Sequence, residues 1–405
     1  MKRRDDITVR CADCDTEFTI TADEQSFYKN KGLTLPKRCK ACRQKRKSLK
    51  EARDKALRDK AEAERREQEE RELLARVKAS KIQQTEFTQL INTNPSTTLF
   101  IIGNGFDIMH GVPSSYWHFQ KTLGKHSELR RHLETYLKIE PDKLWYNLED
   151  SLSHINAGVM LDVMDMWLDI FEVYRHNSES MADLHCAIDT AMLPVQVITE
   201  QLPKRFRTWV ESLCADGSKP CAHFLSAEST YLNFNYTDFL ETLYGVSRPN
   251  INYIHGCRTK EKGKPKEQLV LGHVPNVDYL EGYTPNPVMV PRYKNPRKQG
   301  ILEYALGIGI SQWISYYEQV FTKHSPEIIE ENLAFFRNTE HMTDIFVIGH
   351  SLSKVDYPYF EEIDKYNAGK AFWHIGYHSL ADFENVLAFV REMGIKDTSF
   401  EIFRT

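Results

Sequence analysis

The sequence lacks any long apolar run. No stretch of its 405 residues approaches the roughly 18 consecutive apolar residues that a membrane-spanning helix requires. The first residues, Met-Lys-Arg-Arg-Asp-Asp, are charged and no apolar segment follows them, so they do not read as a secretory signal. We therefore expect a cytoplasmic protein that does not enter a membrane.

The sequence also lacks a strong excess of charge of one sign. The net charge is −4, but residues 1–85 carry a charge of +8 and residues 86–405 a charge of −12. A basic head on an acidic body predicts two parts with different partners. Because the basic surplus of the head is modest and mixed with acids, it allows nucleic-acid binding without requiring it.

Cysteine is present, but disulfides are not expected in a cytoplasmic chain. Of the eight cysteines, four form the pairs Cys11-x2-Cys14 and Cys39-x2-Cys42, which 24 residues separate. Zinc prefers four thiolates in a tetrahedron, and each Cys-x-x-Cys turn supplies two of them. The spacing therefore predicts a structural zinc site over residues 1–44.

The segment around these cysteines resembles a small bacterial family of zinc-ribbon domains. The resemblance rests on Val9-Arg-Cys-Ala-Asp-Cys, on Phe27-Tyr28 and Gly32, and on Pro36-Lys-Arg-Cys-Lys-Ala-Cys-Arg. That family has no firmly established ligand, so the resemblance supports the metal. A nucleic acid and another protein, such as a phage protein, remain equal candidates for the partner of the ribbon.

Glycine and proline are both missing from residues 43–81, which are rich in Lys, Arg, Glu and Ala. Acids and bases three or four residues apart, such as Glu62 and Arg66, stabilise an exposed helix. We expect a solvated helical spacer over residues 45–85. A dimerising coiled coil, and with it a homo-oligomer, is the alternative, although Leu49, Ala56 and Ala63 make a weak seam.

A glycine-rich turn follows the apolar run 98–102. Gly103 and Gly105 flank Asn104, Phe106 and Asp107 come next, and Gly111 and Pro113 follow. A buried strand that ends in Gly-x-Gly brings backbone N–H groups close to a phosphate or a ribose. The third glycine stands eight residues after the first, so the usual dinucleotide fingerprint does not fit. A turn without a ligand is the alternative.

The rest of the chain alternates apolar strands with helical patterns, which is typical of an α/β fold with a doubly wound, mostly parallel Rossmann-like sheet. We expect strands at 98–102, 231–235, 251–255, 268–272, 344–349, 371–376 and 399–403, and helices at 355–366 and 380–393. Residues 86–405 are thus one nucleotide-binding domain. Residues 115–230 are too many for one crossover, so they predict a helical insertion over the strand ends.

Polar turns follow four of these strands. They are Asn233-Phe-Asn-Tyr-Thr-Asp238, His255-Gly256, Gly272-His273, and Gly349-His350-Ser351 with Asp356 beyond. In a parallel sheet these turns meet at the same edge as the glycine-rich turn. We therefore expect one site at that edge.

These motifs together resemble the AbiH family, which is associated with bacterial abortive infection against phage. The resemblance covers residues 97–405 and rests on Gly103-Asn-Gly-Phe-Asp, Gly111-Val-Pro113, Trp145-x3-Glu149, Phe234-Asn-Tyr-Thr with Glu241, His255-Gly256 and Gly349-His-Ser-Leu. The same series is similar, more distantly, to sirtuin-like domains that bind and often cleave NAD. Thr237 stands where those domains have an aspartate, which argues against protein deacylation.

The sirtuin-like resemblance implies the cleavage of a nicotinamide–ribose bond, which builds positive charge on the sugar. The catalytic candidates are His255 as a base, Asn235 for the ribose or the water, and Asp107 and Glu149 as charge-stabilising carboxylates. The binding candidates are Gly103, Asn104, Gly105, Phe106, Pro113, Gly349 and Ser351. Plainer roles exist for each: His255 fits an ordinary turn, and Asn235 and Asp107 fit helix caps.

Three functions follow from these candidates. The first is an anti-phage effector that hydrolyses NAD or a related nucleotide. The second is a sensor that binds a nucleotide without cleaving it, with the zinc ribbon as an adaptor. The third and weakest is a metal-dependent nuclease that uses Asp107, Glu149 and Asp238.

Overall fold

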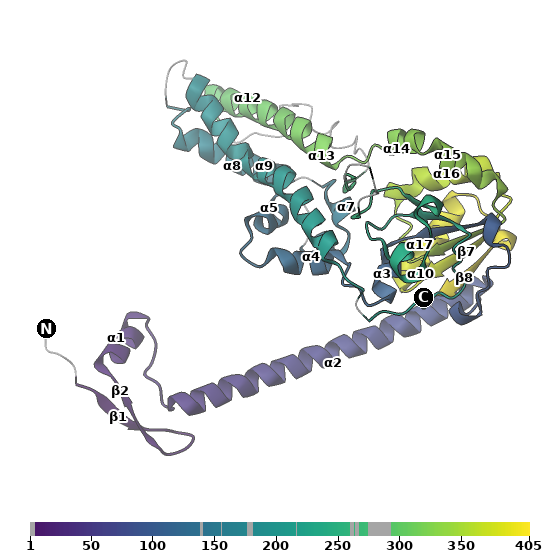
Figure 1. The fold of residues 1–405 in the computed structure, drawn as a ribbon. Helices are drawn as coiled ribbons and strands as arrows, with labels where there is room; N and C mark the ends of the chain where they lie inside the picture. Colours follow the sequence, from purple (N-terminus) through teal and green to yellow (C-terminus); the bar gives the residue numbers. More distant parts are fainter. Residues whose placement is uncertain are drawn as a thin grey trace. The chain divides into compact units, whose positions relative to one another are not determined.

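The computed structural model describes residues 5–137, 141–154, 156–175, 181–215, 217–259, 263, 267–273 and 293–405. The chain divides into two compact units, Met1–Ala79 and Ser80–Thr405 (Figure 1). None of the helices among the described residues is long and apolar enough to cross a membrane.

The first unit begins with an antiparallel hairpin of β1 (Ile7–Arg10) and β2 (Glu17–Ile20). Helix α1 (Ala22–Asn30) follows, and its N-terminus carries a capping box in which Thr21 and Glu24 satisfy each other's backbone N–H groups. The long helix α2 (Lys40–Ser80) completes the unit. Cys11 and Cys14 lie in the turn after β1, and Cys39 and Cys42 lie at the start of α2.

Helix α2 runs for 41 residues and begins five residues before the predicted boundary at residue 45. Ion pairs one turn apart line its surface, among them Arg66 with Glu62 and Lys60 with Glu64. Such exposed pairs contribute a few tenths of a kcal/mol each. Leu49, in the weak seam of the coiled-coil alternative, is exposed. Whether the helix acts as a spacer or as a coil stays a prediction.

The second unit is built on a parallel sheet with six strands among its described residues. The strand order is β5-β4-β3-β6-β7-β8, and every neighbouring pair is parallel. The bounds are β3 Thr98–Ile102, β4 Thr230–Asn233, β5 Ile251–Tyr253, β6 Asp344–Ile348, β7 Phe372–Tyr377 and β8 Phe400–Arg404. All five residues of β3 are buried, as expected for a central strand covered on both faces.

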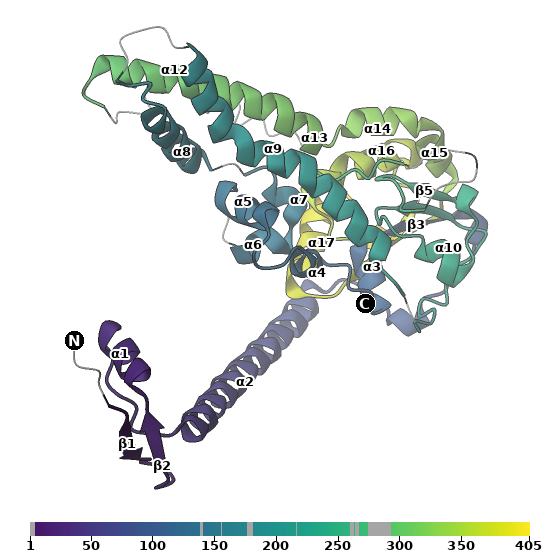
Figure 2. The same ribbon diagram turned by 60° about the vertical axis from the view of Figure 1, so that its left-hand side comes forward.

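Helices pack on both faces of this sheet (Figures 1 and 2). On one face, Phe100 of β3 and Phe346 of β6 share a core with Phe106 of α3 (Asn104–Met109) and Leu240 of α10 (Phe239–Tyr244). On the other face, Trp373 of β7 contacts Phe389 of α17 (Leu380–Glu392), and Phe234, which follows β4, contacts Phe360 of α16 (Tyr357–Asn367). The expected α/β architecture with a central parallel sheet is confirmed.

One expected strand is wrong. Residues 268–272 do not form a strand, and only the next residue, His273, makes an isolated bridge, with Thr322. The side chains of Leu269 and Leu271 pack against the core of the helical insertion, while the Val270 N–H donates to the His255 carbonyl at 2.9 Å. Its backbone groups are thus satisfied by neighbouring loops rather than by a strand ladder.

The helices between β3 and β4 form a separate core of large apolar side chains around Trp145, Phe119 and Phe206. Helix α12, which follows β5 in the chain, packs against α8 and α9 and so extends the insertion beyond the expected residues 115–230. The bounds are α4 Tyr116–Leu123, α5 Glu128–Tyr136, α6 Pro141–Tyr146, α7 Leu148–Ser151, α8 Ala157–Ile170, α9 Met181–Ser212, α12 Pro296–Trp313, α13 Gln319–Phe321, α14 Ser325–Glu331 and α15 Leu333–Asn338.

Candidate functional site

A cavity of about 1060 Å³ lies at the carboxyl ends of strands β3 to β7. All four catalytic candidates from the sequence, Asp107, Glu149, Asn235 and His255, line it. Five of the seven binding candidates line it as well, namely Gly103, Asn104, Gly105, Gly349 and Ser351. Phe106 and Pro113 are not among the described lining residues, and Phe106 is buried in the sheet core. Three of the four expected turns therefore meet at this cavity, whereas Gly272 and His273 are not among its described lining residues.

Glycines bring the loop after β3 into close backbone contact with the loop after β6. Gly103 and Gly105 donate their N–H groups to the carbonyls of Ile348 (3.0 Å) and Gly349 (2.7 Å). A Cβ on Gly349, which has a φ of +63°, would lie 2.2 Å from the Phe106 nitrogen. The backbones approach too closely for any side chain. The N–H groups that the sequence suggested for a phosphate thus hold the loop after β6 in this structure.

Asp107, in the first turn of α3, lies in a buried polar group with two side chains of the loop after β4. Its Oδ1 accepts a hydrogen bond from Asn235 Nδ2 at 2.9 Å, and its Oδ2 accepts one from the Thr237 hydroxyl at 2.7 Å. Asn235 also donates to the Gly103 carbonyl at 3.0 Å. Burial raises the pKa of Asp107 to about 7, although both hydrogen bonds oppose the shift. This carboxyl exchanges its proton near neutral pH.

A second buried group is centred on Lys323, which follows α13 and is 1% exposed. Its ammonium donates to Glu149 Oε2 at 2.9 Å and to Asp356 Oδ1 at 3.3 Å. Burial opposes the charged form, but the two carboxylates raise the pKa of Lys323 above its usual value. Lys323 therefore holds a carboxylate of the insertion and a carboxylate of the sheet around one buried positive charge.

The same aspartate meets a histidine of the loop after β6. His350 Nε2 lies 3.4 Å from Asp356 Oδ2, and His350 Nδ1 accepts the N–H of Leu352 at 2.9 Å. The proton of a neutral His350 therefore sits on Nε2, toward the carboxylate. Leu352 adopts a left-handed backbone with a φ of +51°, which is uncommon for a residue with a branched side chain. Although Asp356 is buried, Lys323 and His350 hold its pKa below the usual range.

His255 is a buried side chain of this site with an unpartnered nitrogen. It follows β5, is 3% exposed, and its ring packs against Phe234 and Tyr359. Its Nε2 has no hydrogen-bond partner, and the nearest carboxylate oxygen, on Asp356, is 3.9 Å away. Burial and then the charge of Lys323 hold the pKa of His255 well below its ordinary value, so the ring is neutral. A neutral imidazole with a vacant nitrogen can accept a proton or a hydrogen bond.

Sequence reasoning did not assign a role to Lys323, Tyr236, His350 or Asp356. His350, Asp356 and Tyr236 stand in or near motifs that the sequence displays, and the Tyr236 hydroxyl lies 3.1 Å from Glu149 Oε1. Lys323 follows no strand and carries no motif, so the sequence held no signal for it. Between Trp145 of α6 and Glu149 of α7 the helix is interrupted at Asn147, whose side chain caps α7.

The carboxylates proposed for a nuclease metal site do not come together. Glu149 contacts Lys323, Asp107 contacts Asn235 and Thr237, and Asp238 pairs with Arg258. Across the part of the chain that the structure describes, the four N-terminal cysteines are the only group of three or more potential ligands close enough for one metal ion. The nuclease hypothesis therefore finds no support in the placement of these groups.

The four cysteines fit a structural zinc ion. The Sγ atoms of Cys11, Cys14, Cys39 and Cys42 lie within 4.8 Å of one another, and those of Cys14 and Cys39 are 3.8 Å apart. Zn–S bonds of about 2.3 Å in a tetrahedron place neighbouring sulfurs about 3.8 Å apart. The Cys39 N–H also points at Cys11 Sγ at 3.3 Å, a contact that favours a thiolate.

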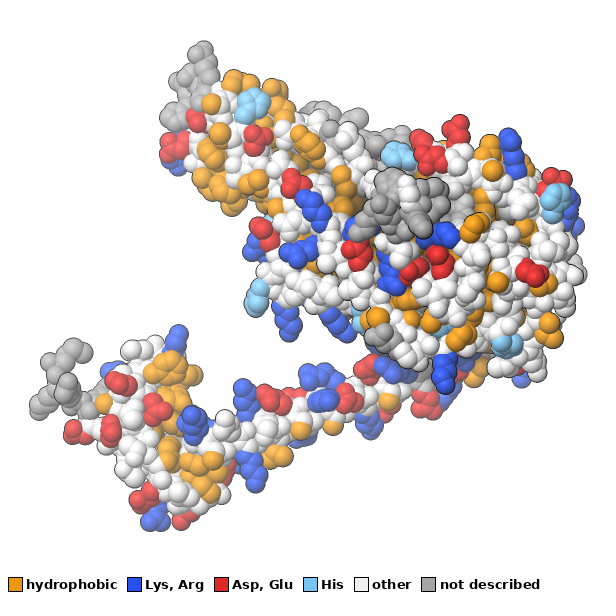
Figure 3. Space-filling model, viewed as in Figure 1, with side chains coloured by type: hydrophobic (Ala, Val, Ile, Leu, Met, Phe, Trp, Pro, Cys, Tyr) orange, Lys and Arg blue, Asp and Glu red, His pale blue; other side chains and the backbone are white. Residues whose placement is uncertain are grey.

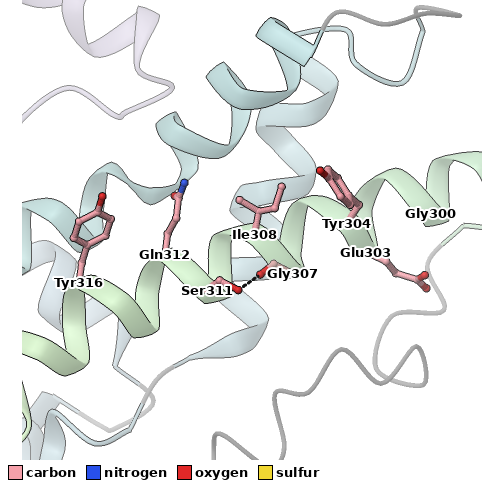
Figure 4. A pocket seen from close by; sticks show the side chains of 8 residues that line it. All are labelled: Gly300, Glu303, Tyr304, Gly307, Ile308, Ser311, Gln312 and Tyr316. Atoms are coloured by element: carbon pink, nitrogen blue, oxygen red, sulfur yellow. Dashed lines mark hydrogen bonds between the residues drawn. The ribbon is translucent and has the colours of Figure 1, made fainter.

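A second hollow, of about 790 Å³, lies along helix α12 and the π-helical turn that follows it (Figure 4). Tyr304 and Tyr316 project from it, and the Ser311 hydroxyl donates to the Gly307 carbonyl. Glu303 is its only described acidic or basic lining residue. This hollow therefore lacks the paired titratable groups that distinguish the cavity at the sheet edge.

Comparison with known families agrees with the two units. The family model described as bacteriophage abortive infection AbiH matches residues 99–377, which is more than half of the chain, and the model described as probable treble clef domain matches residues 5–51. The chain therefore belongs to the AbiH family and carries an N-terminal treble clef domain. No curated protein and no solved structure matches it.

Proposed function

We propose that the chain is an abortive-infection effector that binds NAD or a related nucleotide in the cavity and hydrolyses its N-glycosidic bond. The observation that carries this proposal is His255, a residue that lines the cavity and whose buried Nε2 has no hydrogen-bond partner. Family membership supports the role in phage defence.

The sheet supports a nucleotide as the ligand. The order β5-β4-β3-β6-β7-β8 matches the order of doubly wound dinucleotide-binding sheets, with the reversal beside β3. Such folds bind their ligands outside the carboxyl ends of the strands, at this reversal. The cavity lies there, and its volume of about 1060 Å³ is at the upper end of the range for small-molecule sites. A dinucleotide is a ligand of fitting size.

The buried groups support glycosidic cleavage. Water adds to the ribose carbon as the bond to the nicotinamide nitrogen breaks; nicotinamide leaves as a neutral molecule, and one proton is released. Because nicotinamide leaves as a neutral molecule, no acid is required for the leaving group, and His255 Nε2 accepts the proton that the attacking water loses. Both amide N–H groups of Asn235 are used within the protein, which leaves its Oδ1 for a ribose hydroxyl or the water. Two carboxylates around one ammonium favour positive charge on the sugar.

A direct test measures NAD by mass spectrometry in phage-infected cells that carry the protein, beside plaque formation. We expect NAD to fall in cells with the natural protein and to persist in cells with His255→Ala or Asn235→Ala, which should also lose protection. His324→Ala is the matched control, because the His324 side chain is 57% exposed and outside the cavity lining. Protection by the natural protein without any change in NAD would overturn the proposal. The two variants are interpreted only if their thermal stability equals that of the control.

A second candidate is a sensor that binds the nucleotide without cleaving it. It is favoured by Thr237, which occupies an aspartate position of the sirtuin-like pattern and donates to Asp107 rather than supplying a free carboxylate. Under this alternative, the purified chain binds NAD with measurable affinity in calorimetry but releases no nicotinamide. Release of nicotinamide that stops in His255→Ala would exclude the sensor.

A further inference from the structure

The net positive charge of helix α2 and of the residues just before it lies at the N-terminal end of the helix. Residues 37–50 contain eight Lys or Arg and no Asp or Glu, whereas residues 51–80 contain nine of each sign. The first turn of the helix has no acidic residue and includes Lys40 and Arg43. Basic side chains in a first turn oppose the helix dipole and cost stability. The basic end is therefore not explained by the needs of the helix itself.

Four of these side chains share one exposed face. Lys40, Arg43, Lys47 and Lys50 follow the spacing i, i+3, i+7 and i+10, which places them within about 80° of arc on a helix. All four are exposed. Two have neighbours: Arg43 Nη1 donates to the Tyr28 hydroxyl at 2.8 Å, and Lys47 Nζ lies 3.9 Å from Glu51. We call these four residues the basic face.

Other basic side chains of the segment have structural roles. Arg38 and Arg46 form ion pairs with Asp13 at 2.9 Å and 2.7 Å. Asp13 lies between Cys11 and Cys14, so these pairs connect the turn after β1 to the start of α2. Cys39 and Cys42 anchor the start of α2 at the metal site. The basic face is thus presented by a helix that the treble clef domain fixes, rather than by a loose tail.

We propose that the basic face binds the phosphate backbone of double-stranded nucleic acid. The four cations extend from residue 40 to residue 50, a rise of about 15 Å along the helix, and a duplex presents several phosphates over this length. A helix of about 10–12 Å diameter also fits the major groove. Residues 40–50 include no aromatic residue, so the basic face itself carries no stacking surface of the kind that single-strand binding uses, although Tyr28 of α1 contacts Arg43 beside it.

The test uses the full chain with zinc bound and a labelled 30-base-pair DNA duplex, followed by fluorescence anisotropy at 50 and 200 mM salt. Four phosphate contacts predict that binding weakens about 150-fold across this range. The triple variant Lys40→Gln, Lys47→Gln, Lys50→Gln keeps only the contact of Arg43. Its affinity should therefore weaken only about fourfold between 50 and 200 mM salt. Affinity at 50 mM salt should fall by at least tenfold.

The matched control is Lys55→Gln, Arg58→Gln, Lys60→Gln, which removes the same charge from the same helix where acids and bases alternate (Figure 3). It should bind like the natural chain, and both variants should hold the same zinc. The inference is wrong if the natural chain does not bind the duplex or if both variants lose the same amount of affinity for it. It is also wrong if the natural chain binds a single strand more tightly than the duplex. It does not depend on the cavity, so His255→Ala should leave duplex binding unchanged.

Discussion

The stability of the second unit should depend on pH through Asp107, and Asp107→Asn isolates the effect. The carboxyl has a pKa of about 7 in the fold against a reference value of 3.8. An aspartate whose pKa is raised by folding contributes fully to stability below pH 3.8 and loses that contribution as pH rises through 7. Because one pKa unit is worth about 1.36 kcal/mol, a shift of about three units lowers the free energy of unfolding by about 4 kcal/mol above pH 7.

Asn at position 107 has no charge to bury and can keep both contacts. Its oxygen would accept from Asn235, and its amide would donate to the Thr237 hydroxyl. The difference in free energy of unfolding between the variant and the natural chain should therefore shift in favour of the variant by about 3 kcal/mol from pH 5 to pH 8. Urea unfolding followed by circular dichroism at both pH values measures this gain. Asp397→Asn, at an exposed aspartate, should follow the natural chain. An equal gap at both pH values for Asp107→Asn would refute the reasoning.

Three further changes test the described contacts. Lys323→Met leaves Glu149 and Asp356 without their buried counter-ion, so it should destabilise the chain by about 3–5 kcal/mol, and urea unfolding should show a smaller loss at low pH. Gly349→Ala forces a Cβ to 2.2 Å from the Phe106 nitrogen and should lower the unfolding free energy by more than about 1 kcal/mol, whereas Gly300→Ala on α12, which meets nothing within 4 Å, should not lower it. Cys39→Ser should release the zinc of the treble clef domain in metal analysis; full zinc retention would contradict the assigned ligands.

Much of the fold was predictable because local patterns carry it. The buried strand 98–102 is a mostly apolar run that ends at glycine, and the highly charged residues 43–81, which contain no glycine or proline, predict a long helix. The expected strand at 268–272 failed for a physical reason. Its short apolar run fills a gap between the insertion and the loop after β5, and periodicity does not distinguish such a segment from a strand.

The site was predictable only where a residue stands at the end of a strand. Asp107, Asn235 and His255 follow β3, β4 and β5, so the topology of a parallel sheet brings them to one edge. Lys323 reaches the site through tertiary packing, from a segment 174 residues away from its partner Glu149. Glycines 103, 105 and 349 were recognised, but their closest contacts are with each other's loops, which a sequence does not reveal.

The buried ammonium of Lys323 also has a consequence for how quickly a ligand can enter and leave. Glu149 belongs to the insertion and Asp356 to the sheet, so a swing of the insertion away from the sheet would break the contact with Glu149 and leave unlike charges separated in a poorly solvated interior. Such a rupture costs several kcal/mol, which slows it by a factor of hundreds or more. For the nucleotide that we propose as the ligand, exchange through rearrangement of the loops at the cavity mouth would avoid that barrier, so we expect these loops, rather than hinge opening, to set its residence time.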